Sequence, residues 1–376
     1  MFIRRPRPKK NITLRDVAKH AGVSPKTVSN VINNWPYITD ETRQKVQDAI
    51  NMLGYRPNGL ATSLRTGRTN TIGVVIPDIT NPFFGQVVRG CEDVLYAAGY
   101  NIFLCNTNED PVKERGYLDM LVSRGVDGLL MFGARSDSEV LSAIVHDGIP
   151  IVAEDSPAQH NNSTVIEIDN LGGAQLATKH LISRGHTRIG HLAGPVHRLA
   201  AETRLQGYQY ALESAGIPYD EELVYRCSPS IHGGYQSTLQ IMREKKPSAL
   251  FCYNDLMAVG AMVACRQLDL DIPREVALVG FDDIAIASLV EPALTTIRVR
   301  QYDMGKLASQ LLLERLSGKE NPSTHVQFQV ELVIRNSCGA RRLSKKQLDG
   351  MLEQLLSSEL IDLSTCGPGG ASQKNS

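Results

Sequence analysis

The fold of the first part of the chain is indicated by residues 13–33, which read TLRDVAKHAGVSPKTVSNVIN. Apolar side chains recur there at the three- and four-residue spacing of an amphipathic helix, at Leu14, Val17, Ala18 and Ala21. Thr13 and Asp16 have the spacing of a capping box, which predicts that this helix begins after Thr13. Gly22 predicts its end.

Two further helices are predicted on the same grounds. Ser24 is a good helix cap, and Pro25 suits a first helical position because no backbone N–H is needed there. A third helix is predicted between Thr39 and Gly54. Two short helices joined by a glycine-containing turn predict a helix-turn-helix, with residues 25–33 as the recognition helix.

The outward side of this second helix is polar, which leaves two interpretations. Its members can hydrogen-bond to base edges and phosphates, and they are Pro25, Lys26, Ser29, Asn30 and Asn33. The alternative is a small basic helical bundle whose polar side is only solvated. The distribution of charge favours the DNA-binding interpretation.

The chain of 376 residues has 40 basic and 40 acidic side chains, and its net charge of zero conceals a strong asymmetry. Residues 1–70 hold 13 Lys and Arg against four Asp and Glu, a net charge of +9, so the rest of the chain carries −9. Such a division predicts a segment that binds a polyanion and a body that does not.

A short helical pattern follows Pro57. Residues 58–65 contain a glycine and two β-hydroxy residues, so a helix there is marginal in isolation. Residues 66–70 are polar and predict a linker.

From residue 71 the pattern changes to apolar runs that alternate with helix-period stretches. The runs are residues 72–76, 102–105, 128–132, 151–153, 165–168, 189–192, 249–252 and 276–281. The helical stretches are residues 83–98, 111–124, 137–147, 171–185, 199–215, 232–244 and 255–268. This alternation predicts an α/β fold, with parallel sheets covered on both faces and divided between two domains. Ligands in such folds bind beyond the carboxyl ends of the strands.

Several classes of protein are disfavoured. No apolar run is long enough to cross a bilayer, and the basic N-terminus is not followed by the apolar stretch of a secretory signal. The seven cysteines are scattered and never spaced as CxxC, so we expect neither structural disulfides nor a cysteine-based metal site. Neither GxGxxG after the first strand, nor GxxxxGK[ST], nor GxSxG occurs, so we expect no catalytic residues, metal or cofactor, and no enzyme.

Residues 13–33 closely resemble the DNA-binding signature of the lactose-repressor (LacI/GalR) family. The resemblance continues in order to residue 340 through short motifs such as Gly54-Tyr55-Arg56-Pro57-Asn58, Asn81-Pro82-Phe83-Phe84, Arg204-Leu205-Gln206-Gly207-Tyr208, Asn254-Asp255 and Val279-Gly280-Phe281-Asp282-Asp283. It implies an N-terminal all-α helix-turn-helix domain and two Rossmann-like lobes of the type I periplasmic-binding-protein fold.

The resemblance also implies roles for residues of the head. Pro25, Lys26 and Asn30 would read the operator, while Ser24, Thr27, Ser29 and Asn33 would contact its backbone. The remaining DNA-binding positions implied by the match are Thr13, Tyr55, Asn58, Ala61 and Leu64. Leu64 would wedge into the minor groove from a hinge helix that forms only on operator DNA. Pro25 departs from the polar or aromatic residue more usual at its position, so the operator sequence is not inferred.

In the body, the resemblance implies an effector-binding cleft lined by Phe83, Phe84, Asp155, Arg204, Asn254 and Asp282. These side chains suit a small polyol, because carboxylates accept hydroxyl protons and an aromatic ring covers the C–H side. Each residue also has a purely structural interpretation. Either Phe could belong to the core, and Arg204 could be a surface cation. The remaining three, Asp155, Asn254 and Asp282, could cap helices. His186 and His191 are expected to be structural. Two departures from the family, Val299 and the lack of an obvious aromatic near Pro229, favour fewer stacking contacts or a different metabolite.

These observations divide the chain into a DNA-binding head with a basic arm (1–57), a hinge and linker (58–70), an effector-binding and dimerisation domain (71–340) and a partly helical tail (341–376). We expect a bacterial, cytoplasmic, nucleoid-associated repressor of a sugar catabolic operon. It would bind a pseudo-palindromic operator as a homodimer or tetramer, under control of a sugar or sugar derivative and without contact with a membrane. An alternative is a regulator of the same family that responds to a nucleobase or nucleoside, or acts with a co-repressor. A periplasmic solute-binding protein or an enzyme would explain the body alone.

Overall fold

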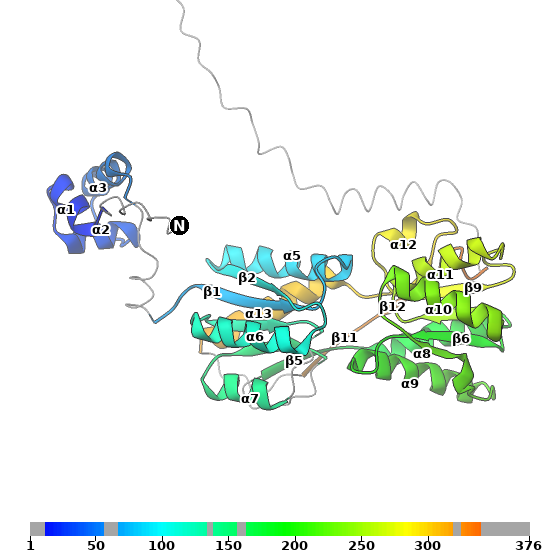
Figure 1. The fold of residues 1–376 in the computed structure, drawn as a ribbon. Helices are drawn as coiled ribbons and strands as arrows, with labels where there is room; N and C mark the ends of the chain where they lie inside the picture. The colour runs from blue at the N-terminus through cyan, green and yellow to red at the C-terminus, as the bar shows by residue number, and fades with distance from the viewer. Residues whose placement is uncertain (1–11, 56–66, 134–137, 156–162, 319–324, 340–376) are drawn as a thin grey trace, which may run out of the picture. The chain divides into compact units, whose positions relative to one another are not determined.

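The computed structural model describes residues 12–55, 67–133, 138–155, 163–318 and 325–339. The chain divides after Thr69 into two compact units, here called the head and the body. Each unit is described by itself (Figure 1).

The head contains three helices in its described part, α1 (Leu14–Ala21), α2 (Pro25–Ile32) and α3 (Asp40–Leu53). They begin and end where the sequence predicts. Thr13 and Asp16 form the capping box of α1, and Ser24 Oγ accepts the Thr27 N–H at the start of α2. Gly22 and Gly54 follow α1 and α3 in the left-handed conformation, with φ of 66° and 63°. The three helices enclose a small core built on Val17, Val28, Val31 and Val46.

The first lobe of the body is built on a parallel sheet of six strands in the order β11-β5-β4-β3-β1-β2. The strands are β1 (Thr71–Ile76), β2 (Asn101–Asn106), β3 (Gly128–Met131), β4 (Ile151–Glu154), β5 (Ser163–Ile168) and β11 (His325–Phe328). One face of this sheet is covered by α5 (Pro82–Ala97) and α13 (Gln301–Leu316). The other is covered by α6 (Pro111–Ser123) and α7 (Ser138–His146).

The second lobe has the same plan, with strand order β12-β10-β9-β8-β6-β7. Its strands are β6 (Ile189–Ala193), β7 (Val224–Arg226), β8 (Ala249–Cys252), β9 (Ala277–Asp282), β10 (Thr295–Arg298) and β12 (Glu331–Val333). Only β12 among them pairs antiparallel. The sheet lies between α8 (Asn170–Ser183) with α9 (Leu199–Ser214) and α10 (Ile231–Glu244) with α11 (Asp255–Gln267). The short helices η1 (Glu221–Leu223) and α12 (Ile286–Leu289) lie in connections.

The chain passes between the lobes three times, after β5, after β10 and after β11. The α/β architecture and the eight predicted strands are therefore confirmed, whereas β7, β10, β11 and β12 were not predicted. At the edge of the first sheet, the side chains of Phe103 and Leu104 on β2 remain exposed. No helix in the described ranges is both long and apolar enough to cross a membrane.

Candidate functional site

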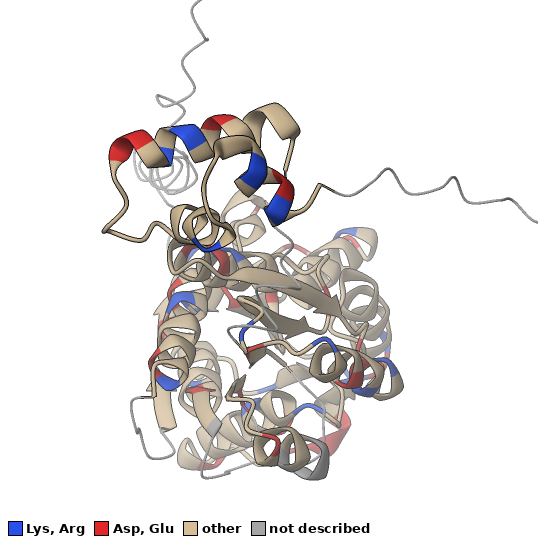
Figure 2. Ribbon diagram, turned by 90° about the vertical axis from the view of Figure 1, so that its left-hand side faces the viewer, with Lys and Arg blue, Asp and Glu red and all other residues tan. Residues whose placement is uncertain are grey.

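The predicted recognition helix α2 presents polar groups and little charge. Pro25, Lys26 and Asn33 are exposed, and Thr27, Ser29 and Asn30 are half-buried. Lys26 is the one charged residue of α2, whereas acidic and basic side chains are mixed along α3 (Figure 2). Such a surface can form hydrogen bonds with base edges and phosphates, as the sequence predicts.

The other predicted DNA-binding residues differ in what holds them. Thr13 is exposed and also caps α1, and Ser24 caps α2. Tyr55 is half-buried against the core of the head. Asn58, Ala61 and Leu64 lie outside the described residues, as do the basic arm and the tail.

Two exposed aromatic residues beside α2 were not singled out from the sequence. Asn34, at φ 51°, turns the chain after α2, and the side chains of Trp35 and Tyr37 that follow are 51% and 85% exposed. Arg43 of α3 holds this turn by donating to Asn34 Oδ1 at 3.3 Å and to the Trp35 carbonyl at 3.2 Å. An exposed tryptophan next to the predicted recognition helix can contact the same partner only if that helix binds DNA, which stays a prediction. The signal in the sequence is that Trp35 is the single tryptophan of the chain and directly follows the predicted recognition helix.

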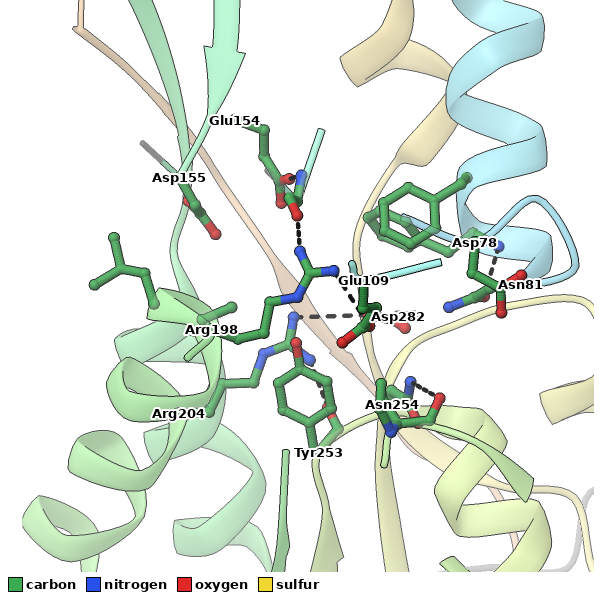
Figure 3. Close-up of a pocket in the computed structure, with 16 residues that line it drawn as sticks. Asp78, Asn81, Glu109, Glu154, Asp155, Arg198, Arg204, Tyr253, Asn254 and Asp282 are labelled. Atoms are coloured by element: carbon green, nitrogen blue, oxygen red, sulfur yellow. Dashed lines mark hydrogen bonds and ion pairs between the residues drawn. The ribbon is translucent and has the colours of Figure 1, made fainter. Parts of the chain in front are cut away.

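In the body, a cavity that opens to solvent lies at the carboxyl ends of strands from both lobes, and the space within its outline is about 710 Å³ with the open solvent included (Figure 3). Its lining residues are Asp78, Asn81, Phe83, Phe84, Glu109, Gly133, Glu154, Asp155, Arg198, Leu199, Ala200, Arg204, Pro229, Tyr253, Asn254 and Asp282. All six predicted effector-binding residues are among them. The structure thus brings these six together, and that they bind an effector stays a prediction.

Arg204 of α9 is the buried cation of this cavity. Its Nε donates to Asn170 Oδ1 at 2.8 Å and its Nη1 donates to the Tyr253 carbonyl. The guanidinium lies 3.5 Å from the ring centroid of Phe281 and 3.7 Å from Asp282 Oδ1. It is not a surface cation, because this packing and hydrogen bonding hold it in one orientation.

Three carboxyl groups lie near Arg204, of which Asp282 and Glu154 are buried and Asp155 is half-buried. Burial raises the pKa of Asp282 to about 7, opposed by the positive charge of Arg204 and supported by the negative charge of Glu154. Burial likewise raises the pKa of Glu154, and raises that of Asp155 well above its ordinary value. Asp282 can therefore exchange a proton near neutral pH or accept a hydrogen bond from a ligand.

Both carboxylate oxygens of Asp155 already accept hydrogen bonds from other residues of the protein. The backbone of Asp155 is left-handed, with φ 46°, and its carboxylate accepts the Ile168 N–H at 3.1 Å and the Asn170 amide at 2.7 Å. Asn170 in turn accepts from Arg204. Asp155 therefore orients Arg204 through Asn170.

The predicted aromatic and amide residues have structural partners as well. Phe83 is 5% exposed and belongs to the core, while Phe84 is half-buried with its ring 5.0 Å from that of Phe83, edge to face. Asn254 Oδ1 accepts the Met257 N–H at 2.9 Å, so Asn254 also has the structural role of a helix cap for α11.

The sequence prediction missed ten lining residues, of which Glu109, Arg198 and Tyr253 contribute most. Arg198 Nη2 lies 3.2 Å from Glu109 Oε1, and its Nη1 donates to the Gly133 carbonyl. Tyr253 packs under Arg204 and is the aromatic side chain that seemed lacking near Pro229. Tyr253 directly follows β8, so strand-end position was a usable signal for it. Glu109 and Arg198 lie in loops without a distinguishing pattern.

Comparison with known proteins gives concordant results for both units. Residues 13–58 match the family model of bacterial regulatory proteins, lacI family, and residues 178–338 match that of the periplasmic binding protein-like domain. The HTH-type transcriptional repressor PurR of Vibrio parahaemolyticus serotype O3:K6 is 36% identical over 330 residues, which cover 86% of this chain and 98% of the relative.

Two solved structures extend the similarity. A lac repressor dimer bound to operator and the anti-inducer ONPF is 29% identical, with a TM-score of 0.79 over 88% of this chain and 99% of that chain. A complex of the transcriptional regulator CelR with cellobiose is 31% identical, with a TM-score of 0.67 over 87% and 99%.

Proposed function

This chain belongs to the lacI family of bacterial regulatory proteins, and from that membership we propose that it is controlled by a purine base or nucleoside bound in the cavity of the body. As a member it is a DNA-binding transcriptional repressor and not an enzyme. The observation that carries the proposal is the 36% identity, over almost the whole relative, to repressors named PurR, in which Pur stands for purine. This similarity favours the nucleobase alternative over the sugar effector first expected.

The chemistry of the cavity supports a planar heterocycle. Phe84 is a half-buried aromatic side chain of the lining against which a flat ring can pack, whereas the ring of Tyr253 is covered by Arg204. The carboxylate of Asp282 can accept N–H groups of a base, and guanidinium groups can donate to ring nitrogen and carbonyl oxygen. Such a set of polar groups around aromatic walls is typical of a specific small-molecule site.

A sugar is the second candidate, because the CelR structure contains cellobiose and the cavity of this chain is rich in carboxylates. Carboxylates accept hydroxyl protons as well as N–H groups, so the polar groups alone do not separate the two ligand classes. The comparison therefore has to be made with the ligands themselves.

In the mechanism that we propose, a homodimer in the cytoplasm places two recognition helices on a pseudo-palindromic operator. Effector binding changes the angle between the lobes of each body and hence the spacing of the two hinge segments. A coupling of about 1–3 kcal/mol between the sites would alter operator affinity about 5- to 150-fold. The sign of that change distinguishes an inducer from a co-repressor.

The proposal is tested by thermal unfolding of the full-length protein with hypoxanthine, guanine, adenosine, ribose or cellobiose. A purine at 100 times its Kd should stabilise the body by about 2.7 kcal/mol, with little effect from the sugars. The purine should also change affinity for a duplex that the protein itself selects from random DNA. Asp282→Asn should abolish both responses and retain DNA binding. Stabilisation by cellobiose or ribose but by no purine would contradict the proposal.

A further inference from the structure

Two loops meet across the cavity. The loop that follows β6 in the second lobe carries His197 and Arg198, and the loop that follows β2 in the first lobe carries Glu109. Glu109 Oε1 lies 3.2 Å from Arg198 Nη2, and its Oε2 lies 3.3 Å from His197 Nε2. One carboxylate of the first lobe therefore pairs with two basic side chains of the second.

The backbone places Glu109 for this contact. Asn108 and Glu109 are both left-handed, with φ of 55° and 60°, a conformation that residues other than glycine adopt rarely. Two such residues in succession turn the chain sharply, and the Glu109 side chain is only 26% exposed beside Arg198, which is 9% exposed. Figure 3 shows both residues at the cavity, with Arg198 pointing toward Glu109 and Glu154.

Each arginine of the cavity is thus already opposed by an acid. Arg198 faces Glu109, and Arg204 faces Asp282. Three further acids line the same cavity, namely Asp78, Glu154 and Asp155. A phosphate group that entered would have to compete with Glu109 for Arg198 and with Asp282 for Arg204, and in a partly buried site its repulsion from these acids is stronger than in water.

We propose that Glu109 is a specificity-determining residue, which pairs with Arg198 across the cavity and makes the site select uncharged ligands over their phosphorylated counterparts. The inference rests on the proposed function in that the cavity is the effector site, but it does not require the effector to be a purine. An uncharged base, nucleoside or sugar can bind while both arginines stay paired with their acids. A phosphate group requires an arginine to leave its paired acid, because a guanidinium is the group that would bind the phosphate.

The test compares full-length wild-type protein with Glu109→Gln, which retains an acceptor for Arg198 but removes the charge. Glu202→Gln is the matched control. Glu202 lies on α9, the helix that carries Arg204, but it does not line the cavity, and its Oε1 lies 2.7 Å from Arg226 Nη1. Binding is measured by calorimetry for adenosine against AMP, for ribose against ribose 5-phosphate, and for inorganic phosphate alone. Thermal unfolding without ligand shows that each variant is folded.

We expect the wild type and the control to bind the uncharged member of a pair at least tenfold more tightly than its phosphorylated member. Glu109→Gln should gain affinity for inorganic phosphate and for the phosphorylated member by at least tenfold. If ribose binds and adenosine does not, the purine proposal fails, and the comparison of ribose with ribose 5-phosphate then tests the role of Glu109. Preference of the wild type for a phosphorylated ligand, or no gain of phosphate binding in Glu109→Gln, would overturn the inference. Should Glu109→Gln fail to fold, Glu109→Ala carries the same expectation.

Discussion

Asp155 is a half-buried acid and Asp282 a buried acid near Arg204, and the difference between their partners suggests different roles for them. Both oxygens of Asp155 accept hydrogen bonds from the protein, one from Ile168 and one from Asn170. The closest charged partner of Asp282 is Arg204, at 3.7 Å. Asp282 is therefore the carboxylate that a ligand can engage, while Asp155 positions Arg204 through Asn170.

Effector binding should accordingly depend on pH through Asp282. Burial raises the pKa of Asp282 to about 7, so in the effector-free body this group gains its proton as the pH falls through neutrality. An effector that donates an N–H or O–H to the carboxylate then loses affinity, about tenfold per pH unit below 7. Calorimetric titration between pH 8 and pH 6 measures the effect. An affinity that is constant over this range would refute the assignment.

The buried His191 leads to a separate prediction, which concerns how the stability of the body depends on pH. Its ring is fully buried, stacked 4.7 Å from Phe251, with Nδ1 3.0 Å from the Phe251 carbonyl, and burial lowers the pKa of His191 to about 4. Below pH 6.5 the unfolded chain takes up a proton that the folded chain refuses until about pH 4. Stability therefore falls as the pH falls through this window, by about 2 kcal/mol at pH 5.

Replacement of His191 by phenylalanine should remove that loss. Urea unfolding at pH 7.5 and pH 5 should show a difference in unfolding free energy that is smaller by about 2 kcal/mol in His191→Phe than in wild type. The exposed His146→Gln serves as control and should behave as wild type. Equal pH dependence in all three proteins would show that His191 does not account for the loss.

Among the helices of the body, α5 and α13 approach each other closely enough that only glycine fits between them. A Cβ built on Gly90 would collide with the carbonyl of Tyr302, and one on Gly305 with the carbonyl of Val87. Both obstacles are backbone atoms, which cannot rotate away. The Cys91 thiol also reaches the Gly305 carbonyl, at 3.4 Å, across this contact.

Gly90→Ala should therefore destabilise the body by about 1–3 kcal/mol, the usual range for overpacking. Gly85→Ala is the matched control on the same helix, because nothing lies within 4 Å of its Cβ, and the higher helix propensity of alanine should stabilise it by up to about 1 kcal/mol. Chemical unfolding of the two variants should give shifts of opposite sign. Shifts of the same sign would show that α13 yields to the added methyl group.

The turn between α2 and α3 offers a spectroscopic test of the head, because Trp35 is the single tryptophan of the chain. Its indole is half-exposed beside the predicted recognition helix, so we expect its emission to change when the protein binds a selected operator duplex. Trp35→Phe, followed by anisotropy of labelled DNA, should bind several-fold more weakly. Unaltered emission at saturating DNA would place Trp35 outside the interface.

The strands that the sequence predicted and those that it missed differ physically. The eight predicted strands contain apolar runs, because most of them are buried between two helical layers. By contrast, β10 reads TTIR, and β7 and β12 have three residues each, so a period of two cannot be established within them. Cavity residues at strand ends could be predicted by topology, as with Asp282. Glu109 could not, because its partner Arg198 is 89 positions away and the two meet only when the lobes are assembled.

At the scale of the whole molecule, the positive charge that marks the DNA-binding segment is not carried by its three helices. Residues 12–55 have five basic and four acidic side chains, a net charge of +1. Residues 1–11 carry +5 and residues 56–70 carry +3. We therefore expect the helices to supply polar groups for recognition, and the segments on either side to supply most of the attraction to phosphate.

This division predicts which property of DNA binding depends on the N-terminal segment. Replacement of Arg4, Arg5, Arg7, Lys9 and Lys10 by glutamine should weaken binding to operator and non-operator DNA by similar factors, because phosphate contacts carry no sequence information. If all five contact phosphates, the slope of log K against log salt should become shallower by about 4.5 per protomer. Anisotropy titrations from 50 to 200 mM salt measure that slope.

The matched variant is Lys26→Gln, which alters the one charge on α2. Because Lys26 belongs to the predicted recognition surface, its loss should reduce the slope by at most about 0.9 while lowering preference for operator over random DNA. The two variants should therefore separate, one losing affinity without specificity and the other losing specificity. An unchanged salt slope in the fivefold variant would mean that residues 56–70 and the helices supply the phosphate contacts, and that the charge of the first eleven residues is not used on DNA.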